Sequence, residues 1–132
     1  MKQLPENVTA LLSHQNIWYL GTYSDIPNAV PVFFKEVLPD GRLLVGDVFM
    51  KVTLDNILKN GQVCVSACDT GTMEGYQVKG TAVHLTSGEL MDRCKTAVQA
   101  AFGGKLQAKG AVVITPEQVT VTTPGPDNNK PL

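Results

Sequence analysis

The chain has 132 residues, a formal net charge of −1 and no run of lysines or arginines. A chain of this length most often forms one domain with its own core, and this charge argues against nucleic acid or an anionic membrane as the main partner. No apolar stretch reaches the ~20 residues that a membrane span requires. The opening Met-Lys-Gln-Leu-Pro-Glu is no secretory signal. We therefore expect a single cytoplasmic domain.

The first half of the chain predicts a helix followed by hairpins. Apolar residues at helical spacing follow Pro5, and β-branched and aromatic runs alternate with turn residues at Ser24–Asn28 and at Asp40-Gly41. Pro31 has no amide hydrogen, so its strand must lie at an edge or meet a ligand. The expected elements are a helix with Pro5 at its first position, ending at Ser13 or His14, and strands over Asn16–Tyr23, Ala29–Val37 and Arg42–Val45.

The stretch Gly46–Gly61 is the most distinctive part of the sequence. It reads as the end of a buried strand that turns into a short helix, with Thr53 as the expected N-cap and Gly61 as the left-handed end. Free amides at a helix start, beside Lys51, Thr53 and Asn56, are the groups that typically form an anion-binding site. The simpler alternative is a capped surface helix.

The second half predicts two strands, a helix and a final strand or pair of strands. Thr86-Ser87-Gly88-Glu89 has the form of a capping box, and Pro116 interrupts the last β-rich stretch. The tail is poor in apolar residues, so we expect a domain over residues 1–123 and a flexible segment over residues 124–132. The expected elements are strands over Gln62–Cys68 and Tyr76–Leu85, a helix from Ser87 to Gly103, and strand residues over Ala111–Thr115 and Gln118–Thr123.

The three cysteines are Cys64, Cys68 and Cys94. On a strand, Cys64 and Cys68 share a face but stand ~13 Å apart, too far for a disulfide or a shared metal ion. Neither His14 nor His84 has ligand-like neighbours. The pattern predicts structural cysteines and no metal site.

About six strands in antiparallel hairpins, with flanking helices, favour a mainly β fold in the form of a small, closed or partly closed barrel. The order of elements resembles the FMN-binding split-barrel family, which includes pyridoxamine 5′-phosphate oxidase. The resemblance extends from about Leu4 to Val121. It rests on the strings I-W-Y-L-G-T, N-A-V-P-V-F-F, V-G-D-V-F-M-K-V-T-L-D-N-I-L-K-N-G-Q-V, and G-Y-Q-V-K-G-T-A followed by T-S-G-E.

The resemblance implies a six-stranded antiparallel split β-barrel with FMN in a groove between two protomers. It places the flavin ring beside the strand after the first hairpin and the phosphate near the start of the Gly46–Gly61 helix. Phe34, Phe49 and Tyr76 are further aromatic candidates for flavin stacking. The implied cofactor contacts are Pro31, Val32 and Phe33, then Gly46, Asp47 and Val48, and at the phosphate Lys51, Thr53 and Asn56.

One position departs from the family pattern. A lysine is expected immediately before the threonine, but Val52 occupies that place and Lys51 lies one residue earlier. Lys51 could still reach a phosphate on its flexible stem. Alternatively, Thr53, backbone amides and Lys79 hold the phosphate, or the site has lost its cofactor.

The functional prediction is an FMN-binding homodimer that acts as an oxidoreductase or electron carrier. Strands such as Trp18–Tyr23 have large apolar groups on both faces, so a second subunit is expected to cover the outer one. The alternatives are a deazaflavin or nitroaromatic reductase of the same fold and a non-catalytic dimeric module without flavin. No catalytic residue is predicted, because a flavin supplies the redox chemistry itself.

Overall fold

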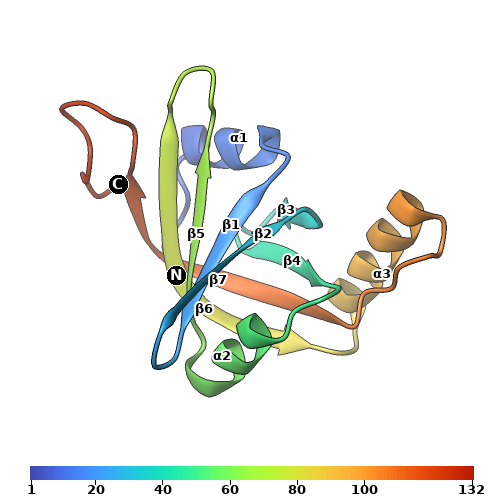
Figure 1. Ribbon diagram of the computed structural model, residues 1–132. Coiled ribbons are helices and arrows are strands. Elements are labelled where there is room, and N and C mark those ends of the chain that lie inside the picture. Colours follow the sequence, from blue (N-terminus) through green and yellow to red (C-terminus); the bar gives the residue numbers. More distant parts are fainter.

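The computed structural model describes all residues from Met1 to Leu132. Three helices flank one sheet that curls into a half-barrel (Figure 1). The elements are α1 (Glu6–His14), β1 (Trp18–Tyr23), β2 (Pro27–Val32), β3 (Lys35–Val37), β4 (Leu43–Asp47), α2 (Val52–Asn60), β5 (Gln62–Cys68), β6 (Gly75–Leu85), α3 (Glu89–Phe102) and β7 (Gly110–Val121). The prediction of a mainly β fold with flanking helices is confirmed.

The strands are ordered β2-β1-β5-β6-β7-β4-β3, and every neighbouring pair is antiparallel. The sheet has seven strands, so the predicted count of six is wrong. The expected strand Ala29–Val37 divides at Phe33 and Phe34, with β2 at one edge of the sheet and β3 at the other. Because β2 pairs only with β1, Pro31 lies in an edge strand, where a missing donor is tolerated.

The last β-rich stretch forms the single strand β7 and continues through Pro116. The β6–β7 register shifts between Lys79 and Gly80, and Gly80 pairs with Pro116. A Cβ at Gly80 would collide with the carbonyl of Thr115. The glycine therefore permits the close approach that accommodates a proline inside a long strand.

Two hydrophobic clusters stabilise the fold. The larger fills the inside of the curled sheet, where α1 closes one end and Trp18 Nε1 donates to the Leu12 carbonyl at 2.8 Å. The smaller lies between α3 and the sheet, where Met91, Cys94 and Val98 pack near β4 and β7. The phenylalanine-lined segments described below lie beside this second cluster.

All three helix starts differ from the sequence prediction. At α1 the helix begins at Glu6, and Pro5 is the cap position because its ψ of 151° is extended and not helical. At α2 the cap position is Lys51, without a side-chain cap, because the helix begins at Val52 and Thr53 lies inside its first turn. The buried Thr53 hydroxyl accepts a bond from Asn28 Nδ2 at 3.0 Å. At α3 the cap position is Gly88, and no capping-box hydrogen bond forms. The predicted left-handed end of α2 at Gly61 is confirmed by its φ of 67°.

The last segment of the chain lies along β7. Asn129 N donates to Val121 O at 2.8 Å, Leu132 N donates to Val119 O at 2.9 Å, and Pro131 pairs with Thr120. The sequence predicts a flexible segment over residues 124–132 because it has few apolar side chains. The structure shows that backbone hydrogen bonds to an open strand edge hold part of this segment instead.

The cysteines are free: Cys94 is buried, Cys64 is half-buried and Cys68 is exposed. Burial alternates along β5, so Cys64 and Cys68 share one face of the strand, as predicted, and that face is the outer face of the sheet. No group of three or more metal-binding side chains gathers anywhere in the chain. None of the three helices has the length and apolar character needed to cross a bilayer.

Candidate functional site

The site is a cavity of about 500 Å³ between β2, the start of α2 and the end of α3. We call it the phenylalanine cavity. It brings together seven of the nine predicted contact residues, while Asp47 and Asn56 do not line it. Its lining consists of Asn28, Val30, Pro31, Val32, Phe33, Phe34, Gly46, Val48, Phe49, Met50, Lys51, Val52, Thr53, Phe102 and Leu106.

One end of the cavity is polar and lies at the start of α2. The first amides of a helix have no partner within it, and no side chain caps them here. Lys51 and Val52 are both exposed and both line the cavity, while the Thr53 hydroxyl is held by Asn28. The one-residue displacement of the lysine therefore leaves its side chain at the same end of the cavity.

Asn56 was predicted to contact phosphate, but it lies behind the cavity wall. Only 3% of this residue is exposed, and Asn56 Nδ2 donates to Thr22 Oγ1 at 3.0 Å. Together with the Asn28–Thr53 bond, this contact fixes α2 against β1 and β2. Asn56 therefore positions the helix without reaching the cavity.

Asp47 is fully buried beneath the loop that connects β4 to α2. Asp47 Oδ2 lies 2.8 Å from His84 Nε2, and Oδ1 accepts the Met50 amide at 2.9 Å. Lys109 Nζ donates to the Met50 carbonyl and lies 3.7 Å from Asp47 Oδ1. A Cβ at Gly110 would collide with the His84 ring, so the glycine makes room for this cluster. Asp47 thus fixes the loop between β4 and α2 from its buried side.

The other end of the cavity is aromatic. All four phenylalanines of the chain line the cavity, and the Phe34 and Phe102 rings meet edge to face with centroids 5.6 Å apart. Sequence reasoning missed Phe102 and Leu106, because they lie at the end of α3 and just after it, far along the chain from the other lining residues. Phe102 lies four residues after the buried Val98, so it extends the apolar stripe of α3 beyond the core.

Tyr76, an aromatic candidate from the sequence, lies elsewhere. Its hydroxyl donates to Glu74 Oε2 at 2.6 Å and accepts from Asn7 Nδ2 at 2.9 Å. Burial, followed by the neighbouring Glu74, raises the pKa of this phenol. Tyr76 therefore links α1 to the start of β6 and has no place in the phenylalanine cavity.

Comparison with known proteins shows the family of this chain. A family model described as pyridoxamine 5′-phosphate oxidase matches residues 4–124. This chain belongs to the pyridoxamine 5′-phosphate oxidase family. The resemblance inferred from the sequence strings is thereby confirmed.

Similar proteins are found both by sequence and by structure. An uncharacterized protein of Methanocaldococcus jannaschii is 32% identical over 131 residues, which cover 97% of this chain and 87% of the relative. HupZ of Group A Streptococcus has a TM-score of 0.81 at 20% identity over 96% of this chain and all of its own. An FMN-binding protein of Syntrophomonas wolfei has a TM-score of 0.80 at 16% identity, covering 92% and 87% of the two chains. The last two similarities show the fold.

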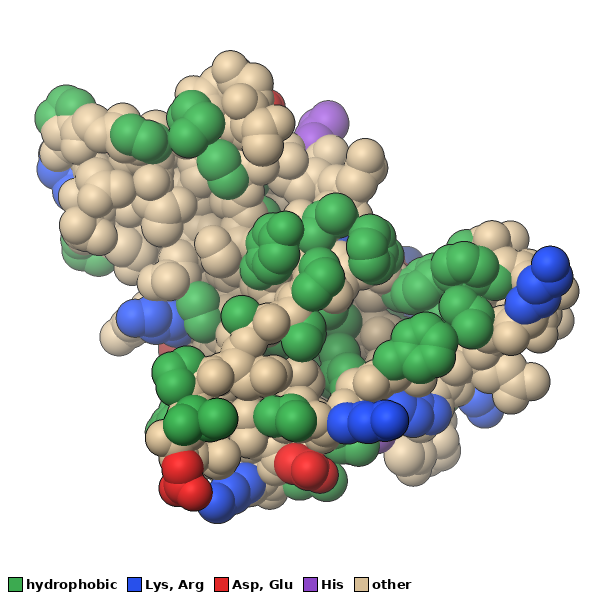
Figure 2. Space-filling model, viewed as in Figure 1, with side chains coloured by type: hydrophobic (Ala, Val, Ile, Leu, Met, Phe, Trp, Pro, Cys, Tyr) green, Lys and Arg blue, Asp and Glu red, His purple; other side chains and the backbone are tan.

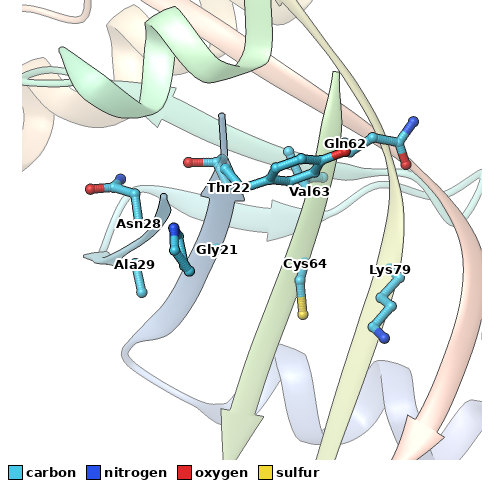
Figure 3. Close-up of a pocket in the computed structure, with 10 residues that line it drawn as sticks. Gly21, Thr22, Asn28, Ala29, Gln62, Val63, Cys64 and Lys79 are labelled. Carbon is cyan, nitrogen blue, oxygen red and sulfur yellow. The ribbon is translucent and has the colours of Figure 1, made fainter. Parts of the chain in front are cut away.

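A second depression lies on the outer face of the sheet in this pyridoxamine 5′-phosphate oxidase family member. We call it the outer-face hollow; it measures about 630 Å³ (Figure 3). Cys64 and Lys79 are register partners on β5 and β6, and their side chains lie side by side there. Burial raises the pKa of the Cys64 thiol, although Lys79 and Gln77 partly offset this. Lys79 lines this hollow and not the phenylalanine cavity.

Proposed function

We propose that this chain is an FMN-binding homodimeric flavoprotein that holds FMN at the dimer interface and acts as an oxidoreductase or electron carrier. The observation that carries the proposal is the phenylalanine cavity, which combines a cationic helix start with apolar walls in one space. Its volume of about 500 Å³ is within the range of small-molecule sites, roughly 300–1,000 Å³. The described residues therefore fit a ligand with a phosphate at one end and a flat ring at the other.

The phosphate would bind at the start of α2. Uncapped amides and the positive end of the helix dipole favour an anion there. Lys51 adds a mobile positive charge on the same side of the cavity. Asn28 presents its amide beside the buried Thr53 hydroxyl, so Thr53 serves mainly to fix this corner.

The ring would lie between β2 and the end of β4. Pro31, Val32 and Phe33 form one apolar wall, and Gly46 and Val48 form the wall facing the α2 loop. These groups orient a flat ring and keep water from it. When bound, FMN supplies one- and two-electron redox chemistry, which explains a cavity without a carboxylate, histidine or thiol among its lining residues.

The homodimer part of the proposal rests on the outer face of the sheet. Tyr19 is 54% exposed, Tyr23 is 49% exposed and Val83 is 57% exposed, all on strands that border or flank the outer-face hollow. Large apolar groups gathered on one face of a sheet favour coverage by a second subunit. An obligate interface of this kind buries on the order of 2,000 Å² or more.

The test is the absorption spectrum of the purified protein together with its mass in solution. We expect flavin absorption bands, released on denaturation as FMN, and a particle of twice 14.2 kDa by light scattering. Colourless protein that takes up no added FMN would remove the flavoprotein proposal and favour a non-catalytic module. Uptake of a deazaflavin in place of FMN would favour the reductase alternative.

A further inference from the structure

The loop between β4 and α2 rests on three ionisable side chains that do not line the phenylalanine cavity. Asp47 is fully buried at the end of β4, His84 lies on β6 with 9% of its side chain exposed, and Lys109 precedes β7. A buried carboxylate is costly unless donors and charges compensate it. An uncharged acceptor could also bind the Met50 amide, so the charge on Asp47 indicates a further role.

The cluster holds Met50 by both of its backbone polar groups. Met50 N donates to Asp47 Oδ1 at 2.9 Å, and Met50 O accepts from Lys109 Nζ. The next residue is Lys51, the cap position of α2, whose carbonyl accepts the Asp55 amide at 2.9 Å. The uncapped amides at the start of α2 therefore follow directly on a residue that two charged side chains hold in place.

His84 sets the net charge of this cluster. Asp47 Oδ2 lies 2.8 Å from His84 Nε2, and an ionised carboxylate only accepts, so Nε2 donates in both the neutral and the protonated ring. The hydrogen bond is therefore kept in both states, while the charge differs. Because Asp47 and Lys109 cancel, the cluster is neutral with a neutral ring and has one positive charge with a protonated ring. Histidine is the side chain that ordinarily changes charge between pH 5 and 8.

No other charged side chain forms a hydrogen bond or ion pair with His84. Its register partner on β7 is Val112, and Gly110 leaves room for its ring. Figure 2 shows basic side chains along the border of the hydrophobic recess between the sheet and α3. Water and salt screen exposed charges more strongly than buried ones, so His84 is the main variable charge beside the start of α2. The remaining charged residues of the surrounding elements are all exposed: Lys51, Asp55, Lys59, Lys79, Glu89, Asp92, Arg93, Lys95 and Lys105.

We propose that His84 is a positioning residue that makes anion binding at the start of α2 depend on pH. It acts through Asp47 and the charge of the cluster, without lining the cavity itself. Protonation of the ring adds a positive charge beside the helix start, so anion affinity rises as the pH falls. The inference rests on the proposed function, in which the anion is the phosphate of FMN, and adds a regulation of that site.

The first experiment uses sulfate, whose charge stays constant over the pH range of the test. It is titrated into the FMN-free protein at about pH 5.5 and about pH 8, and the backbone amide NMR signals of Lys51–Thr53 report binding. We expect sulfate to bind the parent about three- to tenfold more tightly at the lower pH. His84→Gln keeps an amide donor for Asp47 but does not titrate, so its sulfate affinity should change by less than about twofold. The only other histidine is the exposed His14, and His14→Gln is the matched control that should behave as the parent does.

The second experiment connects the effect with the proposed cofactor. FMN and riboflavin, which lacks the phosphate, are titrated by fluorescence into the parent and His84→Gln at the same two pH values. Titration of the FMN phosphate is common to both proteins, so the difference between them isolates the contribution of His84. We expect the pH dependence of FMN affinity to differ between the two proteins and that of riboflavin affinity to agree.

Several results would overturn the inference. Sulfate that does not shift the Lys51–Thr53 amides, or that binds the parent equally at both pH values, would do so even if His84→Gln fails to fold. A pH dependence that persists in His84→Gln or disappears in His14→Gln would also do so. Equal changes for FMN and riboflavin would reduce His84 to a structural role. Failure of FMN uptake would sink the proposed function separately, because the sulfate measurement needs no flavin.

Discussion

The phenylalanine cavity and the outer-face hollow have similar volumes, about 500 and 630 Å³, but they are built differently. Behind the cavity, buried Asp47, Thr53 and Asn56 make side-chain hydrogen bonds that fix the α2 loop and helix. The hollow lies across neighbouring strands, and its side chains, such as Cys64 and Lys79, stand on the open face of the sheet. Size alone therefore does not distinguish a ligand site from a surface that another subunit covers. The clearer difference is Asp47, whose buried carboxylate holds the α2 loop behind the cavity alone, whereas Thr22 and Asn28, the partners in the other two bonds, also line the hollow.

The largest expected effect is the loss of stability when the buried carboxylate behind the phenylalanine cavity is removed. Asp47→Ala leaves His84, the Met50 amide and Lys109 without their common partner, so we expect a loss of about 3–5 kcal/mol in the free energy of unfolding. Urea denaturation measures it. Asp40→Ala, which removes an exposed ion pair with Arg42, is the control and should leave the urea midpoint close to the parent value. A tolerated Asp47→Ala would show that the loop does not depend on the buried carboxylate.

The next effect is on the outer-face hollow. Tyr19→Lys places a charge in the proposed interface, so we expect the dissociation constant of the dimer to rise by about a hundredfold or more. Sedimentation velocity over a dilution series reports the mass. Thr96→Lys, on the exposed side of α3, should leave the mass unchanged. If the parent protein is already a monomer, the proposed interface is refuted, and so is the proposal that a second subunit covers the outer-face hollow.

A smaller effect is expected at the polar end of the cavity. Lys51→Ala should weaken FMN binding by about tenfold, because a charge-assisted contact to phosphate is lost, while unfolding stability changes little. Val52→Lys should tighten binding, since that residue also lines the cavity. Fluorescence titration of FMN measures both variants, with Lys59→Ala, near the far end of α2, as control. Unchanged affinity in Lys51→Ala would assign the phosphate contact to the helix amides alone.

The smallest effect is on thiol reactivity, and it needs no change of sequence. Burial, and to a lesser extent Glu36, raises the pKa of Cys94 to about 11, and burial raises that of Cys64. Because the thiolate is the reactive form, a raised pKa slows alkylation below it and the rate recovers as the pH approaches it. Timed labelling with mass spectrometry should show Cys68 reacting first and Cys94 last. Labelling of Cys94 as fast as Cys68 would contradict the packing of α3.

Local patterns in the sequence predict the hairpins, the position of α2 and its end at Gly61, because period-two alternation, turn residues and a left-handed glycine act over a few positions. The same patterns, in order, predict the family. Seven of the nine predicted cofactor contacts then meet in one cavity, since they belong to two short segments that the fold brings together. This agreement concerns their position and leaves their contact with FMN as a prediction.

Long-range partners explain the remaining differences. Thr53 lies inside the first turn of α2, where its hydroxyl accepts a bond from Asn28, 25 positions away. The Asp47 carboxylate is buried against His84, 37 positions away. The division of Ala29–Val37 follows from the curl of the sheet, which lets the chain pass from one edge to the other at Phe33 and Phe34. Phe102 joins the cavity only because α3 packs beside β4. None of these events has a signal within a local window of sequence.

The segment that returns along β7 has a consequence for aggregation. Between Val119 and Val121 this segment occupies backbone groups that would otherwise form an open edge, while Lys2 N donates to the Pro116 carbonyl at 2.8 Å further along the same strand. An uncovered β-edge is a template for pairing with other chains. Removing residues 124–132 would therefore expose an aggregation-prone strand edge, while it would leave the phenylalanine cavity and the outer-face hollow unchanged. Precipitation of such a shortened chain would then report lost edge protection and not a lost ligand site.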